Sequence, residues 1–132
     1  MRILIVDDDY INRTKLKVIL TAYGDCDAVP NGEMAVEIFT EAHRENFPYE
    51  LISIDIGLPG IQGTEVLARM RQWEDAQGIA VGDGAKIVMV TSSDEPTDVK
   101  DSFREGCESY VKKPATRESM ASALNLMGVA PE

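Results

Sequence analysis

The chain has 132 residues, 44% of them hydrophobic, which suits one domain with an ordinary core and leaves no room for a second. Its 23 acidic and 13 basic side chains give a net charge of −10, which argues against direct binding of nucleic acid. Membrane insertion is not expected, because no apolar run reaches the roughly 20 residues that span a bilayer. The N-terminus does not read as a secretory signal, so we predict a cytoplasmic protein with reduced cysteines. We expect 1–132 to form a single domain.

Short apolar runs recur along the chain and predict strands. Three of them are apolar throughout, as strands buried on both faces of a parallel sheet are. The predicted strands are 3–6, 26–29, 51–54, 87–90 and 109–111.

Segments with helical periodicity separate these runs. The predicted helices lie around 16–23, 34–42, 64–77, 95–105 and 117–127. Gly24 is expected to end the first, Asn31 and Gly32 to open the second, and Thr116 to cap the last, with Gly128 just beyond its end. Alternating strands and helices predict an α/β fold, with a parallel sheet covered by helices on both faces and joined by right-handed crossovers.

Polar residues follow four of the predicted strands. Residues 7–9 are all aspartate, Asp55 ends the third strand, Thr91 ends the fourth, and Lys113 follows the fifth. Because parallel strands place their carboxyl ends at one edge of a sheet, we expect these side chains to meet there. Converging carboxylates repel one another unless a cation lies among them, and oxygen ligands alone favour Mg²⁺. A lysine and a hydroxyl at the same edge are suited to hold a transferred phosphoryl group.

The order of these motifs resembles the receiver domain of two-component response regulators, over essentially the whole chain. The resemblance implies a flavodoxin-like, doubly wound fold with a five-stranded parallel sheet in the order 2-1-3-4-5. The segments that carry it are 3–9, Asn12-Arg13, 31–35, 54–63, 87–92 and 106–114.

The resemblance also implies roles for particular residues. Asp55 is the expected phosphoacceptor, with Asp8 binding Mg²⁺ directly, Asp7 binding it through water and the Gly57 carbonyl as a further ligand. Mg²⁺ is thus the expected cofactor. The phosphoryl donor is expected to be a sensor histidine kinase or a histidine phosphotransfer protein.

Four further residues follow from the resemblance. Thr91 is expected to hydrogen-bond the phosphoryl oxygens, Lys113 to pair with the phosphoryl group or with Asp55, and Tyr110 to act as the switch aromatic. A cis peptide bond before Pro114 is expected to help aim Lys113. The output face is predicted to comprise the fourth helix, fifth strand and fifth helix, which bind an unidentified downstream protein. The chain is thus expected to be a signalling domain that phosphorylates and dephosphorylates itself, and not a multiple-turnover enzyme.

Two other functions were weighed. A Mg²⁺-dependent phosphatase with an aspartyl nucleophile has Asp-x-Asp at the nucleophile strand, but Gly57 stands two residues after Asp55, so no general acid is in place. A receiver-like module without phosphorylation is disfavoured because the aspartates, threonine and lysine are all present. The glycine-rich turn 57–63 lacks the spacing of nucleotide-binding motifs.

Three remaining features receive non-catalytic interpretations. His43 has no nucleophile or ligand cluster near it in sequence, so we interpret it as a surface or boundary residue. Cys26 and Cys107 are predicted to lie at opposite sides of the sheet, too far apart for a disulfide. The glycine-rich connection 78–85 is predicted to be a flexible loop away from the active edge that serves a partner.

Overall fold

A computed structural model of the chain describes residues 1–92, 100, 102–104 and 106–132. It contains a five-stranded parallel sheet in the order β2-β1-β3-β4-β5, which confirms the predicted topology. All five predicted strands are present, each extended by one residue at one end or both. They are β1 (Arg2–Val6), β2 (Asp25–Val29), β3 (Leu51–Asp55), β4 (Lys86–Thr91) and β5 (Ser109–Lys112).

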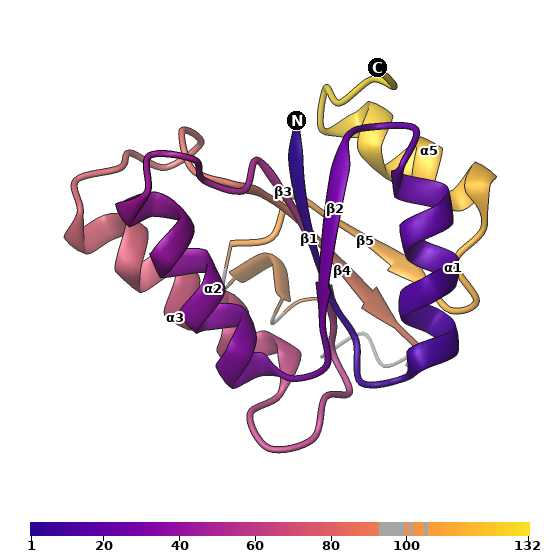
Figure 1. Cartoon of the computed structure of the whole chain (residues 1–132), viewed down its shortest axis with the longest axis horizontal. Helices are drawn as coiled ribbons and strands as arrows, with labels where there is room; N and C mark the ends of the chain where they lie inside the picture. The colour runs from indigo at the N-terminus through magenta and orange to yellow at the C-terminus, as the bar shows by residue number, and fades with distance from the viewer. Residues whose placement is uncertain (93–99, 101, 105) are drawn as a thin grey trace.

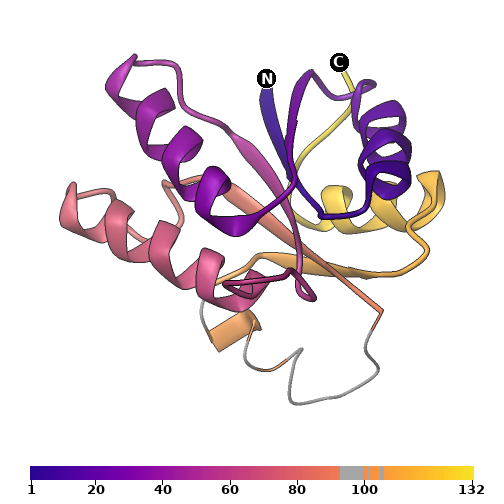
Figure 2. The same cartoon turned by 60° about the horizontal axis from the view of Figure 1, so that its bottom comes forward.

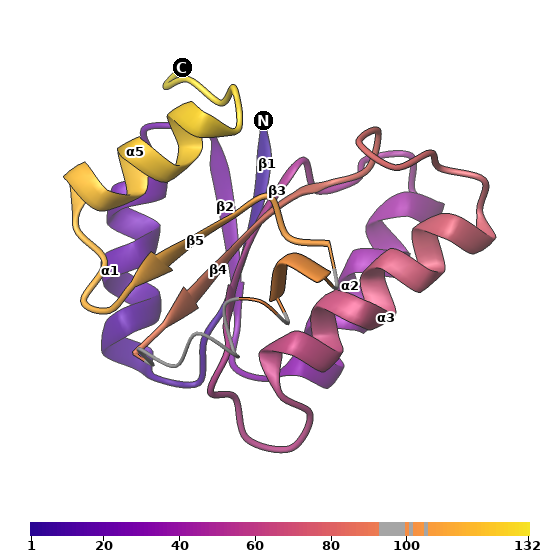
Figure 3. The same ribbon diagram turned by 180° about the vertical axis from the view of Figure 1, so that it is seen from behind.

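Helices cover both faces of this sheet (Figures 1 and 3). On one face lie α2 (Gly32–Arg44) and α3 (Gly63–Ala76), and on the other lie α1 (Tyr10–Leu20) and α5 (Arg117–Leu126). The helix expected at 95–105, including Val99, lies mostly outside the described residues. No helix in the described part of the chain is long and apolar enough to cross a membrane.

The sheet separates two apolar clusters, because successive side chains of a strand point to opposite faces. Leu4 and Val6 of β1 pack with α2 and α3, whereas Ile3 and Ile5 pack with α1 and α5. Met120 of α5 is fully buried in the second cluster.

Helix boundaries follow from local hydrogen bonds. Asp9 caps α1 with its carboxylate, Asn31 caps α2, and Thr116 caps α5 in a reciprocal capping box with Ser119. The predictions for Asn31 and Thr116 are thereby confirmed. The caps fix where each loop turns into its helix, next to the ends of the strands.

The first helix begins and ends earlier than predicted. It ends at Leu20, and the Tyr23 N–H donates to the Leu20 carbonyl in a tighter turn before Gly24. Tyr23 still packs in the core because this turn directs its ring inward. The apolar spacing correctly predicted which side chains are buried, but not where the helix begins and ends.

Figure 2 brings the carboxyl-terminal edge of the sheet towards the viewer. The loops that follow β1 and β3 meet the ends of β4 and β5 at this edge. The N- and C-termini lie at the opposite edge (Figure 1).

Candidate functional site

Three aspartates converge at the carboxyl-terminal edge of the sheet. One carboxylate oxygen from each of Asp7, Asp8 and Asp55 lies within 4.8 Å of the others. Asp7 and Asp55 are buried, while Asp8 is exposed. They meet because β1 and β3 are adjacent parallel strands whose ends are in register.

Backbone N–H groups orient the two buried carboxylates. The Asp9 N–H donates to Asp7 Oδ1 at 2.9 Å, and the Gly57 N–H donates to Asp55 Oδ1 at 3.1 Å. Each donor lies two residues after its acceptor, in the loop that turns away from the strand. The loops therefore hold the carboxylates by short local hydrogen bonds.

Lys113 supplies a positive charge between these carboxylates. Its Nζ lies 3.1 Å from Asp55 Oδ2 and 3.5 Å from Asp7 Oδ2. The Lys113 N–H donates to the Thr91 carbonyl at 2.7 Å, which extends the β4–β5 pairing to the edge. The Lys113–Pro114 peptide bond is cis, as expected.

The pKa values reflect this crowding. Burial raises the pKa of the Asp7 carboxyl, against the lowering effect of the hydrogen bond from Asp9. Burial lowers the pKa of Lys113, but the hydrogen bond and charge of Asp55, together with the charge of Asp7, outweigh burial and raise it. Lys113 is therefore charged at neutral pH, and the ionised form of Asp7 is less favourable in the folded than in the unfolded chain.

The donor set fits a hard divalent cation. Asp7 Oδ2 is fully buried, and despite its ion pair with Lys113 it accepts no hydrogen bond from the residues that the structure describes. A buried oxygen of this kind is costly unless it gains a partner. Carboxylate oxygens with an exposed third member, Asp8, match the partly hydrated oxygen coordination that Mg²⁺ prefers.

The two predicted switch residues differ in exposure. Thr91 ends β4 and is buried, whereas Tyr110 on β5 is 42% exposed. The Tyr110 ring packs edge-on against Phe103 with 6.0 Å between ring centroids. In this structure the tyrosine therefore lies outward, away from the core.

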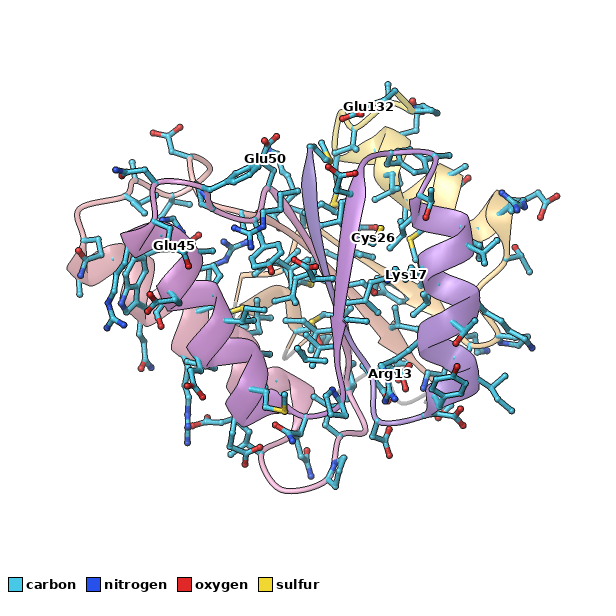
Figure 4. The ribbon with its side chains drawn as sticks, viewed as in Figure 1. Arg13, Lys17, Cys26, Glu45, Glu50 and Glu132 are labelled. Atoms are coloured by element: carbon cyan, nitrogen blue, oxygen red, sulfur yellow. The ribbon has the colours of Figure 1, made fainter. Side chains whose placement is uncertain are left out.

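Some site residues carry no strong sequence signal. Arg13 lies on α1 near this edge (Figure 4), and its Nη1 donates to the Asp7 carbonyl at 2.8 Å. Asn12 and Lys15 line a cavity of about 70 Å³ that also borders Asp7 and Lys113. Asn12-Arg13 is one of the segments that carry the family resemblance, but the sequence assigned neither residue a role. Lys15 has only its i, i+3 spacing from Asn12, which many surface helices share.

Gly63 is needed at the start of α3. A Cβ there would lie 2.2 Å from the Asp55 carbonyl oxygen, so only glycine permits this close approach. The Gly63 N–H donates to the Ile56 carbonyl at 2.9 Å. Gln62 gives α3 no side-chain cap, so backbone packing fixes its first turn.

The residues interpreted as non-catalytic lie away from the aspartates. His43 is half-buried between Phe39 and Trp73, with ring centroids 5.0 and 4.6 Å away. Cys26 lies on β2 (Figure 4) and Cys107 precedes β5; both are free thiols, as predicted.

Comparisons with known proteins identify relatives over nearly the whole length. The family model for the response regulator receiver domain matches residues 3–125. The two-component response regulator ORR41 of Oryza sativa is 32% identical over 127 residues, covering 94% of this chain and 91% of that protein. The peroxide stress-activated histidine kinase mak3 of Schizosaccharomyces pombe is 34% identical, but the match covers 93% of this chain and 5% of the kinase.

A solved structure shares the fold. The receiver domain of the Saccharomyces cerevisiae response regulator Ssk1, co-crystallised with the phosphotransfer protein Ypd1, is similar with a TM-score of 0.81 and 26% identity. The match covers 97% of this chain and 89% of that chain. With the family model, the strand order and the strand-end residues in agreement, the chain belongs to the family of response regulator receiver domains of two-component systems.

Proposed function

We propose that this receiver accepts a phosphoryl group on Asp55 in a Mg²⁺-dependent reaction. The observation that carries the proposal is the placement of the Asp55 carboxylate between the Lys113 ammonium and the Gly57 N–H, both at 3.1 Å. The expected donor is a sensor histidine kinase or a histidine phosphotransfer protein, as the relatives mak3 and Ssk1 suggest. On this account the chain is a self-modifying signalling domain and not a multiple-turnover enzyme.

The transfer needs little covalent help from the protein. An oxygen of the Asp55 carboxylate forms a bond to phosphorus while the bond from phosphorus to the donor's imidazole nitrogen breaks, and the leaving nitrogen keeps the electron pair. Lys113 offsets negative charge beside the acceptor, and the Thr91 hydroxyl is proposed to hydrogen-bond a phosphoryl oxygen. In the later hydrolysis, water attacks phosphorus, the bond from phosphorus to the Asp55 oxygen breaks, and inorganic phosphate leaves while the Asp55 carboxylate is restored.

The proposed metal ligands are Asp7, Asp8, Asp55 and the Gly57 carbonyl, with Asp7 acting through water. When bound, Mg²⁺ would neutralise negative charge on the transferring phosphoryl group. Asp9 and Gly57 keep the Asp7 and Asp55 carboxylates aimed at this position through their N–H groups. The role of the Gly57 carbonyl rests on the family resemblance alone.

Output is proposed to pass through the face formed by the fourth helix, β5 and α5, to a downstream protein. Thr91 drawn towards the phosphoryl group would leave space for the outward Tyr110 ring to turn inward. Phe103 contacts Tyr110 and lies on this face, whereas Met120 is buried and does not. We propose that 1–132 acts as one cytoplasmic unit that does not itself bind nucleic acid.

Labelling with a small phosphodonor tests the acceptor. Acetyl phosphate with Mg²⁺ should add one phosphoryl group, seen by intact mass, and Asp55→Asn should reduce labelling by at least about 100-fold, since the transferring nucleophile is gone. Asp25→Asn, at the opposite end of the sheet, serves as the matched control. Equal labelling of Asp55→Asn and the wild type would refute the assignment.

A second experiment tests whether Thr91 couples the phosphorylation site to the output face. Thr91→Ala should leave labelling largely intact while beryllofluoride-induced NMR shifts at β5 and α5 shrink. Shifts in Thr91→Ala equal to those of the wild type would show that Thr91 does not couple the site to that face.

A further inference from the structure

A groove lies beside α2, outside the site described above. It measures about 380 Å³ and is lined by Val29 at the end of β2 and by four residues of α2: Met34, Glu37, Ile38 and Glu41. β2 is an edge strand, and α2 follows it on the face that also carries α3 (Figure 1). The groove therefore lies at the margin of the molecule, where a partner has free access.

The floor of the groove is apolar. Met34 and Ile38 are one helical turn apart, so they lie on the same face of α2, and Val29 borders them. Met34 is 45% exposed although its thioether chain is apolar. Methionine adapts its shape to different apolar surfaces, which is why it recurs where partners bind.

The wall of the groove is acidic. Glu37 and Glu41 line the groove one helical turn apart. They belong to a row of glutamates that recurs every fourth residue from Glu33 to Glu45, the residue labelled at the end of α2 in Figure 4, so like charges follow one another on successive turns. Such pairs destabilise a helix by mutual repulsion. Within the described part of the chain only Glu41 of this row has an ion pair, with Arg44 at 3.1 Å, and both side chains are more than half exposed.

The strand side of the groove adds no positive charge. Asp27 lies two residues before Val29 and thus on the same face of β2, where it accepts a hydrogen bond from the Tyr49 hydroxyl and pairs with Arg2. No lysine or arginine is among the described residues that line the groove. An apolar floor beside repelling carboxylates is complementary to a segment with apolar anchors and flanking cations.

We propose that this groove binds a basic amphipathic segment of a partner protein, with apolar residues over Met34 and Ile38 and Lys or Arg against Glu37 and Glu41. A second copy of the chain is a poor occupant because each copy carries a net charge of −10. Nucleic acid and anionic lipid are excluded as occupants by the same repulsion. Binding at this groove does not depend on phosphorylation of Asp55.

A synthetic peptide is the probe. A 14-residue peptide of Lys and Leu, with Leu at helical spacing, should bind the wild-type chain saturably in 0.15 M salt. Two-dimensional NMR should place the largest shifts at Val29, Met34 and Ile38. A peptide of the same composition with scrambled order, and a Glu/Leu version, should bind at least about fivefold more weakly, because each lacks one half of the complementarity.

Matched variants separate this site from general attraction to an acidic protein. Glu37→Lys should weaken peptide binding about fivefold or more, whereas Glu118→Lys on α5 makes the same charge change and should weaken it less than about twofold. Met34→Ser should likewise weaken binding, while Leu126→Ser, also exposed, should not.

The outcomes are decisive in both directions. Equal losses in Glu37→Lys and Glu118→Lys, or shifts centred elsewhere, would overturn the proposal. Asp55→Asn should bind the peptide like the wild type, and Met34→Ser should be labelled by acetyl phosphate like the wild type. Failure of the groove is thereby distinguishable from failure of the phosphorylation site.

Discussion

Two clusters of charged side chains lie at opposite edges of the sheet, and they differ in how completely their carboxylates are paired. At the amino-terminal edge, Arg71 donates to Glu74 at 2.7 Å and to both oxygens of Glu108 at 2.8 and 2.9 Å. Backbone N–H groups of Ala85 and Ile87 occupy the second oxygen of Glu74 and one oxygen of Glu108. At the carboxyl-terminal edge, Lys113 pairs with two of the three aspartates, Asp7 and Asp55, and the buried Asp7 Oδ2 accepts no hydrogen bond from the described residues.

The difference separates a structural role from a functional one. The Arg71 cluster joins α3 to the starts of β4 and β5 with its carboxylates paired, so it stabilises the fold. The Lys113 cluster is short of positive charge, which a cation or a phosphoryl–metal pair can supply. Incompletely paired carboxylates therefore distinguish the candidate functional site from the structural cluster.

The largest expected effect on stability comes from breaking the Arg71 cluster, whose carboxylates are fully paired. Arg71→Met should lower the free energy of unfolding by about 3 kcal/mol, because it leaves Glu74 buried without its cation. Urea unfolding followed by circular dichroism measures it. Arg69→Met, on the same helix, removes only an exposed pair with Glu65 and should cost less than about 0.5 kcal/mol. Similar losses for both variants would show that the Arg71 cluster is no more than a surface ion pair.

Adding Mg²⁺ should stabilise the Lys113 cluster, in which three aspartates converge. Mg²⁺ at ten times its dissociation constant should raise the free energy of unfolding by about 1.4 kcal/mol through mass action. Thermal unfolding with Mg²⁺ or EDTA measures this. Asp8→Ala should abolish the increase, whereas Glu118→Ala, an exposed carboxylate on α5, should retain it. A Mg²⁺ effect that survives in Asp8→Ala would place the metal elsewhere.

The same carboxylate-to-amide change should have opposite signs at the two clusters. Asp7→Asn should raise stability in EDTA at pH 7 by about 1 kcal/mol, because burial raises the Asp7 pKa and ionised Asp7 therefore opposes folding. Glu74→Gln should lower stability, because it weakens the pairing with Arg71. Chemical unfolding of both variants in EDTA is the measurement, and destabilisation by Asp7→Asn would contradict this view of the site.

The smallest effect concerns pH and a third region, the α2–α3 contact. Burial lowers the pKa of His43, against the raising effect of Glu74, so its neutral form is favoured in the folded chain. The stability that neutral His43 contributes is fully present above the unfolded-state pKa of 6.5 and is lost as the pH falls below that value. Between pH 7.5 and 5.5 the free energy of unfolding of the wild type should fall by more than that of His43→Leu. Urea unfolding followed by Trp73 fluorescence measures it, and equal losses would remove His43 as a source of pH dependence.

The sequence alone predicted the strands and placed the aspartates and the lysine at one edge of the sheet. The order of the strands was predicted through the family resemblance. These follow from rules that act locally or along one strand: apolar runs, turn residues and the geometry of parallel sheets. Asp7, Asp55 and Lys113 were accordingly expected to meet, and they do.

The Arg71 cluster was not predicted. Arg71 and Glu74 are three residues apart on a helix, a spacing that usually marks an exposed pair, and Glu108 is distant in sequence. Only the packing of α3 against the starts of two strands makes this pair partly buried. The exposure of Tyr110 was equally beyond sequence reasoning, because it depends on how the ring packs against Phe103 in the folded chain.

The glycine at the start of α3 has a mechanical consequence. With no side chain at Gly63, the helix backbone rests directly on the Asp55 carbonyl, and no flexible side chain lies between them to absorb a displacement. A shift of the Asp55 main chain would therefore be expected to push α3 as a rigid rod, and the far half of that helix carries Arg71 and Trp73. α3 thus extends from the Lys113 cluster at the carboxyl-terminal edge of the sheet to the Arg71 cluster at the amino-terminal edge.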